Sequence, residues 1–167
     1  DNISWQEPRN TTARRLSNFL SSTRLYITTI ETHAAAIVGD QSAAQHIKAA
    51  ISRQFDASQS YRIMDALRNY AQHAALPVHS FTIGMSRTPD WQFSDHKFEP
   101  AVKVAALAAD KRFKKETLKE ILDGPPSLEL KPLIREYLES LSKIHIGRGL
   151  SAKKERPCCT VCSRICV

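Results

Sequence analysis

Three residues near the middle of the chain have side chains suited to chemistry at a phosphate: Arg68, Asn69 and His73. An arginine keeps its positive charge throughout the working pH range, and an imidazole gains or loses a proton near neutrality. Asn69 and His73 are four residues apart, so a helix would place them on the same face. A fixed cation beside a proton carrier could bind a phosphate and move protons around it. From spacing alone, however, a solvated or hydrogen-bonded helix face is the better explanation.

The segment that must position these residues is predicted to be one helix, from about 58 to 76. Its apolar residues recur at spacings of three and four and form a single stripe: Tyr61, Met64, Leu67 and Ala71. Pro77 cannot continue a helix and favours extended backbone at the residue before it, so we expect the helix to end near position 76. The stripe therefore predicts a helix that is buried on one side.

The stretch Arg68-Asn69-Tyr70-Ala71-Gln72-His73 resembles the Arg-Asn-x3-His signature of the HEPN superfamily of helical-bundle proteins. The sequence from Leu67 to His79 is also similar to a segment of uncharacterised bacterial proteins. The resemblance covers one helix, supported by helical patterns before and after it. It implies a metal-independent endoribonuclease of the kind that works in toxin–antitoxin and phage-defence systems.

The resemblance also implies roles for the three residues. A neutral His73 would remove the proton from the ribose 2′-hydroxyl, or a charged one would protonate the leaving 5′-oxygen. Arg68 would stabilise the negative charge of the transition state, and Asn69 would orient His73 or hold the phosphate. HEPN enzymes pair two such motifs across a dimer, so we expect a homodimer that needs no metal or cofactor.

The main alternative is a non-catalytic helical module that binds RNA or a protein such as an antitoxin. In that case Arg68 would pair with Asp65, three residues earlier on the same helix, a contact worth a few tenths of a kcal/mol. His73 would need no function either, because a cation in the last turn of a helix is favoured by the helix dipole. The same residues then form a solvated helix face.

Length and composition indicate one all-α domain. The chain has 167 residues, of which 42% are hydrophobic and 25% charged, with only 5 glycines and 8 prolines. Its net charge of +7 suits an acidic partner such as nucleic acid. No apolar run approaches the roughly 20 residues that would cross a bilayer, so no membrane partner is expected. The sequence shows no signal peptide but starts at Asp1 without Met, so a removed leader stays an open alternative to a cytoplasmic protein.

The remaining pattern predicts a helical bundle of about five to six helices with a short extended insertion near 78–100. Gly39 is expected to separate the first two helices, Asp123 to Pro126 to form a turn, and Gly147 to end the last helix. The expected helices other than the one described above cover 12–37, 40–57, 101–109, 113–122 and 130–146. A strand is possible at 78–85, and Trp91 and Phe93 are expected to hold the insertion against the bundle.

Basic residues accumulate after position 100. They are Lys103, Lys111, Arg112, Lys114, Lys115 and Lys119. A charged run of this kind is most often a solvated helix surface, and that is our expectation. The alternative is a nucleic-acid-binding face that acts through salt-dependent phosphate contacts.

The C-terminal residues are basic and contain every cysteine of the chain, namely Cys158, Cys159, Cys162 and Cys166. Four thiols, two of them in Cys-x2-Cys spacing, could fill a zinc shell, but there is little chain for such a site to fold around. We expect a flexible tail, and we divide the chain into a HEPN-like helical bundle at 1–148 and this tail at 149–167. The absence of cysteine from the bundle suits a reducing compartment and hence the cytoplasm.

Overall fold

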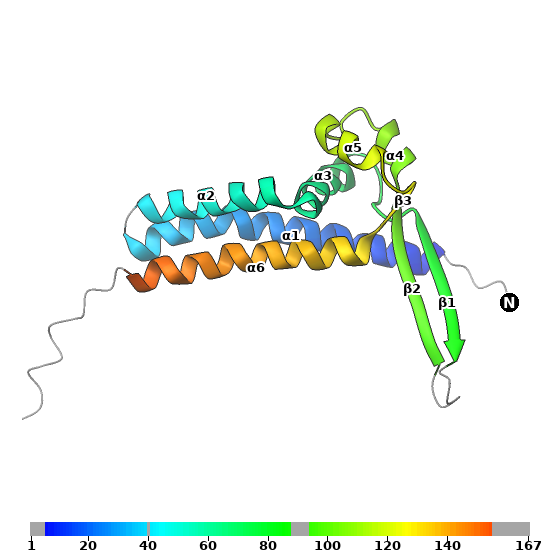
Figure 1. Ribbon diagram of the computed structural model, residues 1–167, viewed down its shortest axis with the longest axis horizontal. Coiled ribbons are helices and arrows are strands. Elements are labelled where there is room, and N and C mark those ends of the chain that lie inside the picture. Colours follow the sequence, from blue (N-terminus) through cyan, green and yellow to red (C-terminus); the bar gives the residue numbers. More distant parts are fainter. Residues whose placement is uncertain (1–5, 40, 88–93, 155–167) are drawn as a thin grey trace, which may run out of the picture.

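A computed structural model describes residues 6–39, 41–87 and 94–154 of the chain. The described part contains six helices and three strands, arranged as in Figure 1. Their bounds are α1 Gln6–Val38, α2 Gln41–Ala57, α3 Gln59–His73, β1 Ser80–Arg87, β2 Ser94–Lys103, α4 Val104–Ala109, α5 Lys115–Leu122, β3 Ser127–Glu129 and α6 Leu130–Lys154. The predicted class, a helical bundle of five to six helices, is confirmed. None of the helices in these ranges has the length and apolarity needed to cross a bilayer.

The long helices lie side by side, and the small elements gather at one end of them. Figure 1 shows α1, α2 and α6 aligned along the length of the molecule, with α4 and α5 at the end where α1 begins. The shorter helix α3 packs against α1, α2 and α6, and it also touches α5. The hairpin of β1 and β2 projects from this same end of the bundle.

The predicted extended insertion near 78–100 is an antiparallel hairpin. Ser80 lies opposite Ala101 and Ile83 opposite Phe98, and β3 extends the sheet on the far side of β2. The prediction that a helix begins at Ala101 is wrong by three residues, because β2 continues to Lys103 and α4 begins at Val104. The apolar spacing of residues 101–103 is compatible with a helix or a strand, and their pairing with β3 makes them part of a strand. Trp91 and Phe93 lie outside the described residues.

Helix α3 forms the centre of the hydrophobic core. Three residues of its stripe are buried, with Met64 and Leu67 0% and Tyr61 4% exposed, while Ala71 near the end of the helix is half-buried. The hydroxyl of Ser58 caps the helix by accepting a hydrogen bond from the Tyr61 backbone N–H at 3.2 Å. The Tyr61 ring meets the ring of Tyr137 on α6 edge-on, with the centroids 5.0 Å apart. Packing and cap together fix both the start and the rotation of α3.

Three helix boundaries differ from the prediction. Helix α1 begins at Gln6 rather than near position 12. Helix α3 ends at His73 rather than at position 76, and the N–H groups of Ala74 and Ala75 both bond to the Tyr70 carbonyl as the chain leaves the helix. Helix α6 does not end at Gly147 but continues to Lys154, so the boundary drawn at 148 falls inside it. Gly39, in contrast, has a φ of 73° and separates α1 from α2 as predicted. The four cysteines lie beyond the described residues.

Replacing Leu67 by alanine tests the central position of α3. Because the leucine is 0% exposed, we expect Leu67→Ala to lower the free energy of unfolding by about 2–5 kcal/mol, measured by urea denaturation. The matched control is Leu25→Ala on α1, whose leucine is 68% exposed and should change the stability by less than about 0.5 kcal/mol. Similar losses for the two variants would contradict this core.

Candidate functional site

Arg68 and Asn69 are joined by a hydrogen bond on the partly exposed side of α3. The Arg68 Nη1 donates to the Asn69 Oδ1 at 3.0 Å, and both side chains are half-buried. The Nε of Arg68 is buried and has no hydrogen-bond partner in the described part of the chain. The structure thus holds one edge of the guanidinium in place and leaves donor capacity unused.

The pairing of Arg68 with Asp65, expected for a helix face without chemistry, does not form. The Asp65 carboxylate instead binds the Lys114 ammonium from the start of α5, with Nζ and Oδ2 2.5 Å apart. The same ammonium lies 5.3 Å from the centre of the Phe55 ring, which favours its position through a cation–π contact. Within residues 6–39, 41–87 and 94–154, Arg68 has no carboxylate partner. Its charge is therefore not balanced by an ion pair.

His73 occupies the last turn of α3 and is exposed. No hydrogen bond between described residues joins it to Arg68 or Asn69. Five residues along an α-helix correspond to a rotation of about 140°, so the Arg68 and His73 side chains leave the helix in strongly different directions. The structure brings Arg68 and Asn69 together, and it places the exposed His73 one turn beyond Asn69 on α3, in a direction well away from Arg68.

Asp110, which the sequence analysis did not single out, lies within electrostatic range of His73. Its Oδ1 accepts hydrogen bonds from the Arg112 backbone N–H at 3.0 Å and from the Arg112 Nε at 3.2 Å, while its Oδ2 is buried without a partner in the described ranges. These Arg112 contacts lower the pKa of Asp110, and the charge of His73 lowers it further. Asp110 stays ionised and is suited to attract the imidazole of His73. The only signal in the sequence was its place at the predicted break after Ala109.

Tyr70 and His79 form a second polar contact at this end of α3. The Tyr70 hydroxyl lies 3.2 Å from the Nε2 of His79, and the Lys103 backbone N–H donates to the Nδ1 at 3.1 Å. A ring that accepts at Nδ1 carries its proton on Nε2, so His79 is neutral and donates to Tyr70. Burial lowers the pKa of His79, and the charges of Lys103 and Arg9 lower it further. Both ring nitrogens are engaged, so His79 serves to position its neighbours.

The basic residues after position 100 do not share one helix. Lys103 ends β2, Arg112 pairs with Asp110 in the loop after α4, and Lys114 is held by Asp65. Lys115 and Lys119 lie on α5, where both are exposed. The expectation of a largely solvated surface agrees with this distribution, and the break expected after Ala109 separates Lys103 from the lysines of α5.

Neither a metal site among the described residues nor a similar protein assigns a function to these side chains. In the described ranges no group of three or more His, Cys, Asp or Glu residues is arranged to hold a metal ion. No family model, curated protein or solved structure matches the chain. The HEPN resemblance therefore stays a prediction that rests on the motif itself.

The neutral state of His79 predicts a pH dependence of stability. In the unfolded chain the imidazole of His79 takes up a proton below its usual pKa of about 6.5, whereas in the folded chain it stays neutral to lower pH. The unfolded state therefore binds more protons, and the free energy of unfolding falls as the pH drops from 7 to 5. We expect His79→Gln to show a flatter decrease over this range in urea titrations. The control His46→Gln changes an exposed histidine on α2 and should keep the wild-type slope. Equal slopes for all three proteins would contradict a neutral His79.

Proposed function

We propose that the chain is a metal-independent endoribonuclease of HEPN type, with a toxin–antitoxin or phage-defence system as its setting. The observation that carries the proposal is the half-buried guanidinium of Arg68, which is tied to Asn69 and has no carboxylate partner in the described ranges. A partly desolvated charge without a counter-ion is costly, and a bound phosphate would supply the missing negative charge. The exposed His73 at the end of the same helix would supply a proton carrier.

The proposed reaction uses the nucleophile that RNA itself contains. A neutral His73 takes the proton of the 2′-hydroxyl while that oxygen attacks the adjacent phosphorus. The bond from phosphorus to the 5′-oxygen then breaks, and a protonated imidazole gives a proton to this leaving oxygen. Arg68 stabilises the additional negative charge on the phosphoryl oxygens as it develops. The products are a 2′,3′-cyclic phosphate and a 5′-hydroxyl, with no net change in protons.

A second copy of the chain completes the proposed site. The base and the acid act on opposite sides of the phosphorus, and each chain offers a single histidine at this position. Because Arg68 and His73 leave α3 in different directions, one phosphate would be contacted most readily by Arg68 of one copy and His73 of the other. The proposal therefore includes a homodimer in which two α3 helices face each other.

Asp110 acts in this proposal as a positioning residue. Its ionised carboxylate has an oxygen without a hydrogen-bond partner in the described ranges and lies within electrostatic range of His73. A carboxylate beside an imidazole orients the ring and stabilises its protonated form. The charge of Asp110 would thus stabilise the protonated imidazole, both in the copy whose His73 acts as acid and in the copy whose His73 has accepted the 2′-hydroxyl proton.

The test is RNA cleavage by the full chain in EDTA, with Arg68→Ala and His73→Ala as variants. Each variant removes a group whose loss typically slows such reactions by about 100-fold or more. The matched controls are Arg53→Ala and His33→Ala, which remove exposed side chains from α2 and α1 and should keep wild-type rates. Mass spectrometry of the products should find the cyclic phosphate.

Two results would refute the catalytic proposal. One is a wild-type protein that binds RNA without cleaving it, as expected for a non-catalytic module. The other is cleavage that survives unchanged in both the Arg68 and the His73 variants.

A further inference from the structure

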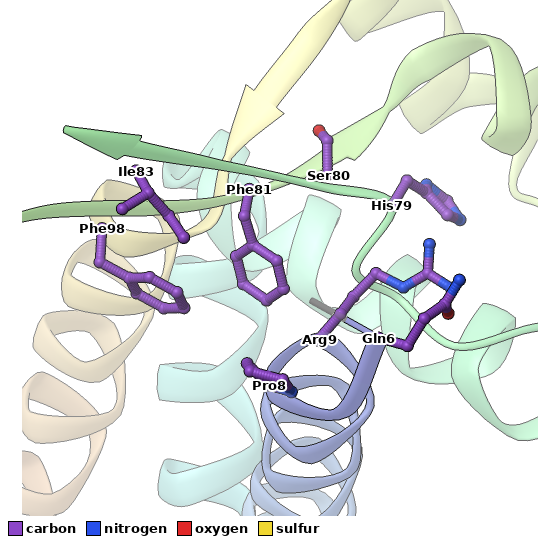
Figure 2. A pocket seen from close by; sticks show the side chains of 8 residues that line it. All are labelled: Gln6, Pro8, Arg9, His79, Ser80, Phe81, Ile83 and Phe98. Carbon is purple, nitrogen blue, oxygen red and sulfur yellow. The ribbon is translucent and has the colours of Figure 1, made fainter. Parts of the chain in front are cut away.

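A cavity of about 750 Å³ lies between the first turns of α1 and the β1–β2 hairpin. Its volume is within the range of roughly 300–1,000 Å³ that small-ligand sites occupy. The cavity has an apolar wall, built from Pro8, Phe81, Ile83 and Phe98, and a polar wall that includes Arg9 and His79. Figure 2 shows these side chains converging from the hairpin and from α1.

The apolar wall presents two aromatic rings. Phe81 and Ile83 are two residues apart on β1 and so share one face of the hairpin, and Phe98 lies opposite Ile83 on β2. The rings of Phe81 and Phe98 lie with their centres 4.7 Å apart and their planes inclined by 30°. Both rings are only half-buried, so part of each remains available to a flat ligand.

The polar wall carries a positive charge that no carboxylate of the described residues balances through an ion pair. The Arg9 Nη2 donates to the Gln6 Oε1 at 2.9 Å, and Arg9 has no ion pair within the described ranges. In Figure 2 its guanidinium lies beside the ring of His79. Because His79 is neutral, Arg9 is the source of positive charge in this wall, and an anion is the ligand that it would attract.

The cavity is connected to the proposed cleavage site. His79 in its polar wall donates a hydrogen bond to Tyr70 on α3. Tyr70 precedes His73 by three residues, which is a rise of about 4.5 Å along the helix. The cavity and His73 are thus parts of one end of α3 rather than separate regions of the molecule.

We propose that this cavity receives an unpaired nucleotide of the RNA substrate, with its base against Phe81 and Phe98 and a phosphate on Arg9. Bases of single-stranded RNA stack on aromatic side chains, whereas a base inside a duplex is already stacked and paired. A cation beside aromatic rings suits a nucleotide better than a purely apolar ligand. This inference rests on the proposed function, because it assigns a substrate class, single-stranded RNA, to that site.

The test measures binding without cleavage, by fluorescence anisotropy with a single-stranded 2′-O-methyl RNA oligonucleotide and with its duplex. We expect Arg9→Gln and Phe98→Leu each to weaken binding of the single strand about tenfold, equivalent to ~1.4 kcal/mol. The matched controls Arg15→Gln and Phe55→Leu change residues outside the cavity and should bind as the wild type does. Wild-type protein should bind the duplex more weakly, and Phe98→Leu should not alter that binding.

The proposal is overturned if the wild type does not bind the single strand, or if Arg9→Gln and Phe98→Leu both bind it with wild-type affinity. Arg9 is on the surface of α1, so Arg9→Gln remains informative even if Phe98→Leu destabilises the hairpin. RNA cleavage by the wild type and by the same variants is measured in a separate assay. Cavity-dependent binding without any cleavage would refute the nuclease alone, and cleavage that ignores both cavity variants would refute the cavity assignment alone.

Discussion

Burial of one face of α3 is the constraint on which the other features depend. Met64 and Leu67 are completely covered, and this packing fixes how the helix is rotated relative to α1 and α6. Once the rotation of α3 is fixed, the direction in which each of its polar side chains leaves the helix is fixed as well. Arg68 and Asn69 are held together at the partly exposed surface, and His73 is exposed one turn beyond Asn69, so the positions of all three residues follow from the packing of the core.

Contacts from distant parts of the chain then determine the electrostatic state of these residues. Lys114 binds the carboxylate of Asp65, the residue that the sequence offered as a partner for Arg68. Asp110 reaches the neighbourhood of His73 because α4 ends beside α3, and the Lys103 backbone fixes the proton of His79. These contacts leave a guanidinium without a carboxylate partner among the described residues, an exposed imidazole with a carboxylate nearby, and a neutral histidine in a structural role.

The sequence predicted the features that depend on local pattern. The helical class, the separation of the first two helices at Gly39 and the stripe of α3 all follow from residue spacing and backbone preference. The strand character of residues 101–103 could not be read locally, because pairing with β3 imposes it. The motif made Arg68, Asn69 and His73 candidates for a site, but it pointed to neither Asp110 nor the cavity, whose walls come from positions 6–9 and 79–98. Such sites arise from contacts between segments that are far apart in the sequence.

The central claim is that Arg68 and His73 act together on one phosphate across two copies of the chain, and a mixing experiment tests it most directly. In this account the site needs the His73 imidazole of both copies, one as base and one as acid, so a dimer that pairs a wild-type chain with a His73→Ala chain has no complete site. The account predicts that such mixed dimers, isolated through two different affinity tags, cleave RNA no faster than His73→Ala homodimers do. Mixed dimers that retain a substantial part of the wild-type rate would contradict it, because a single chain would then carry a complete site.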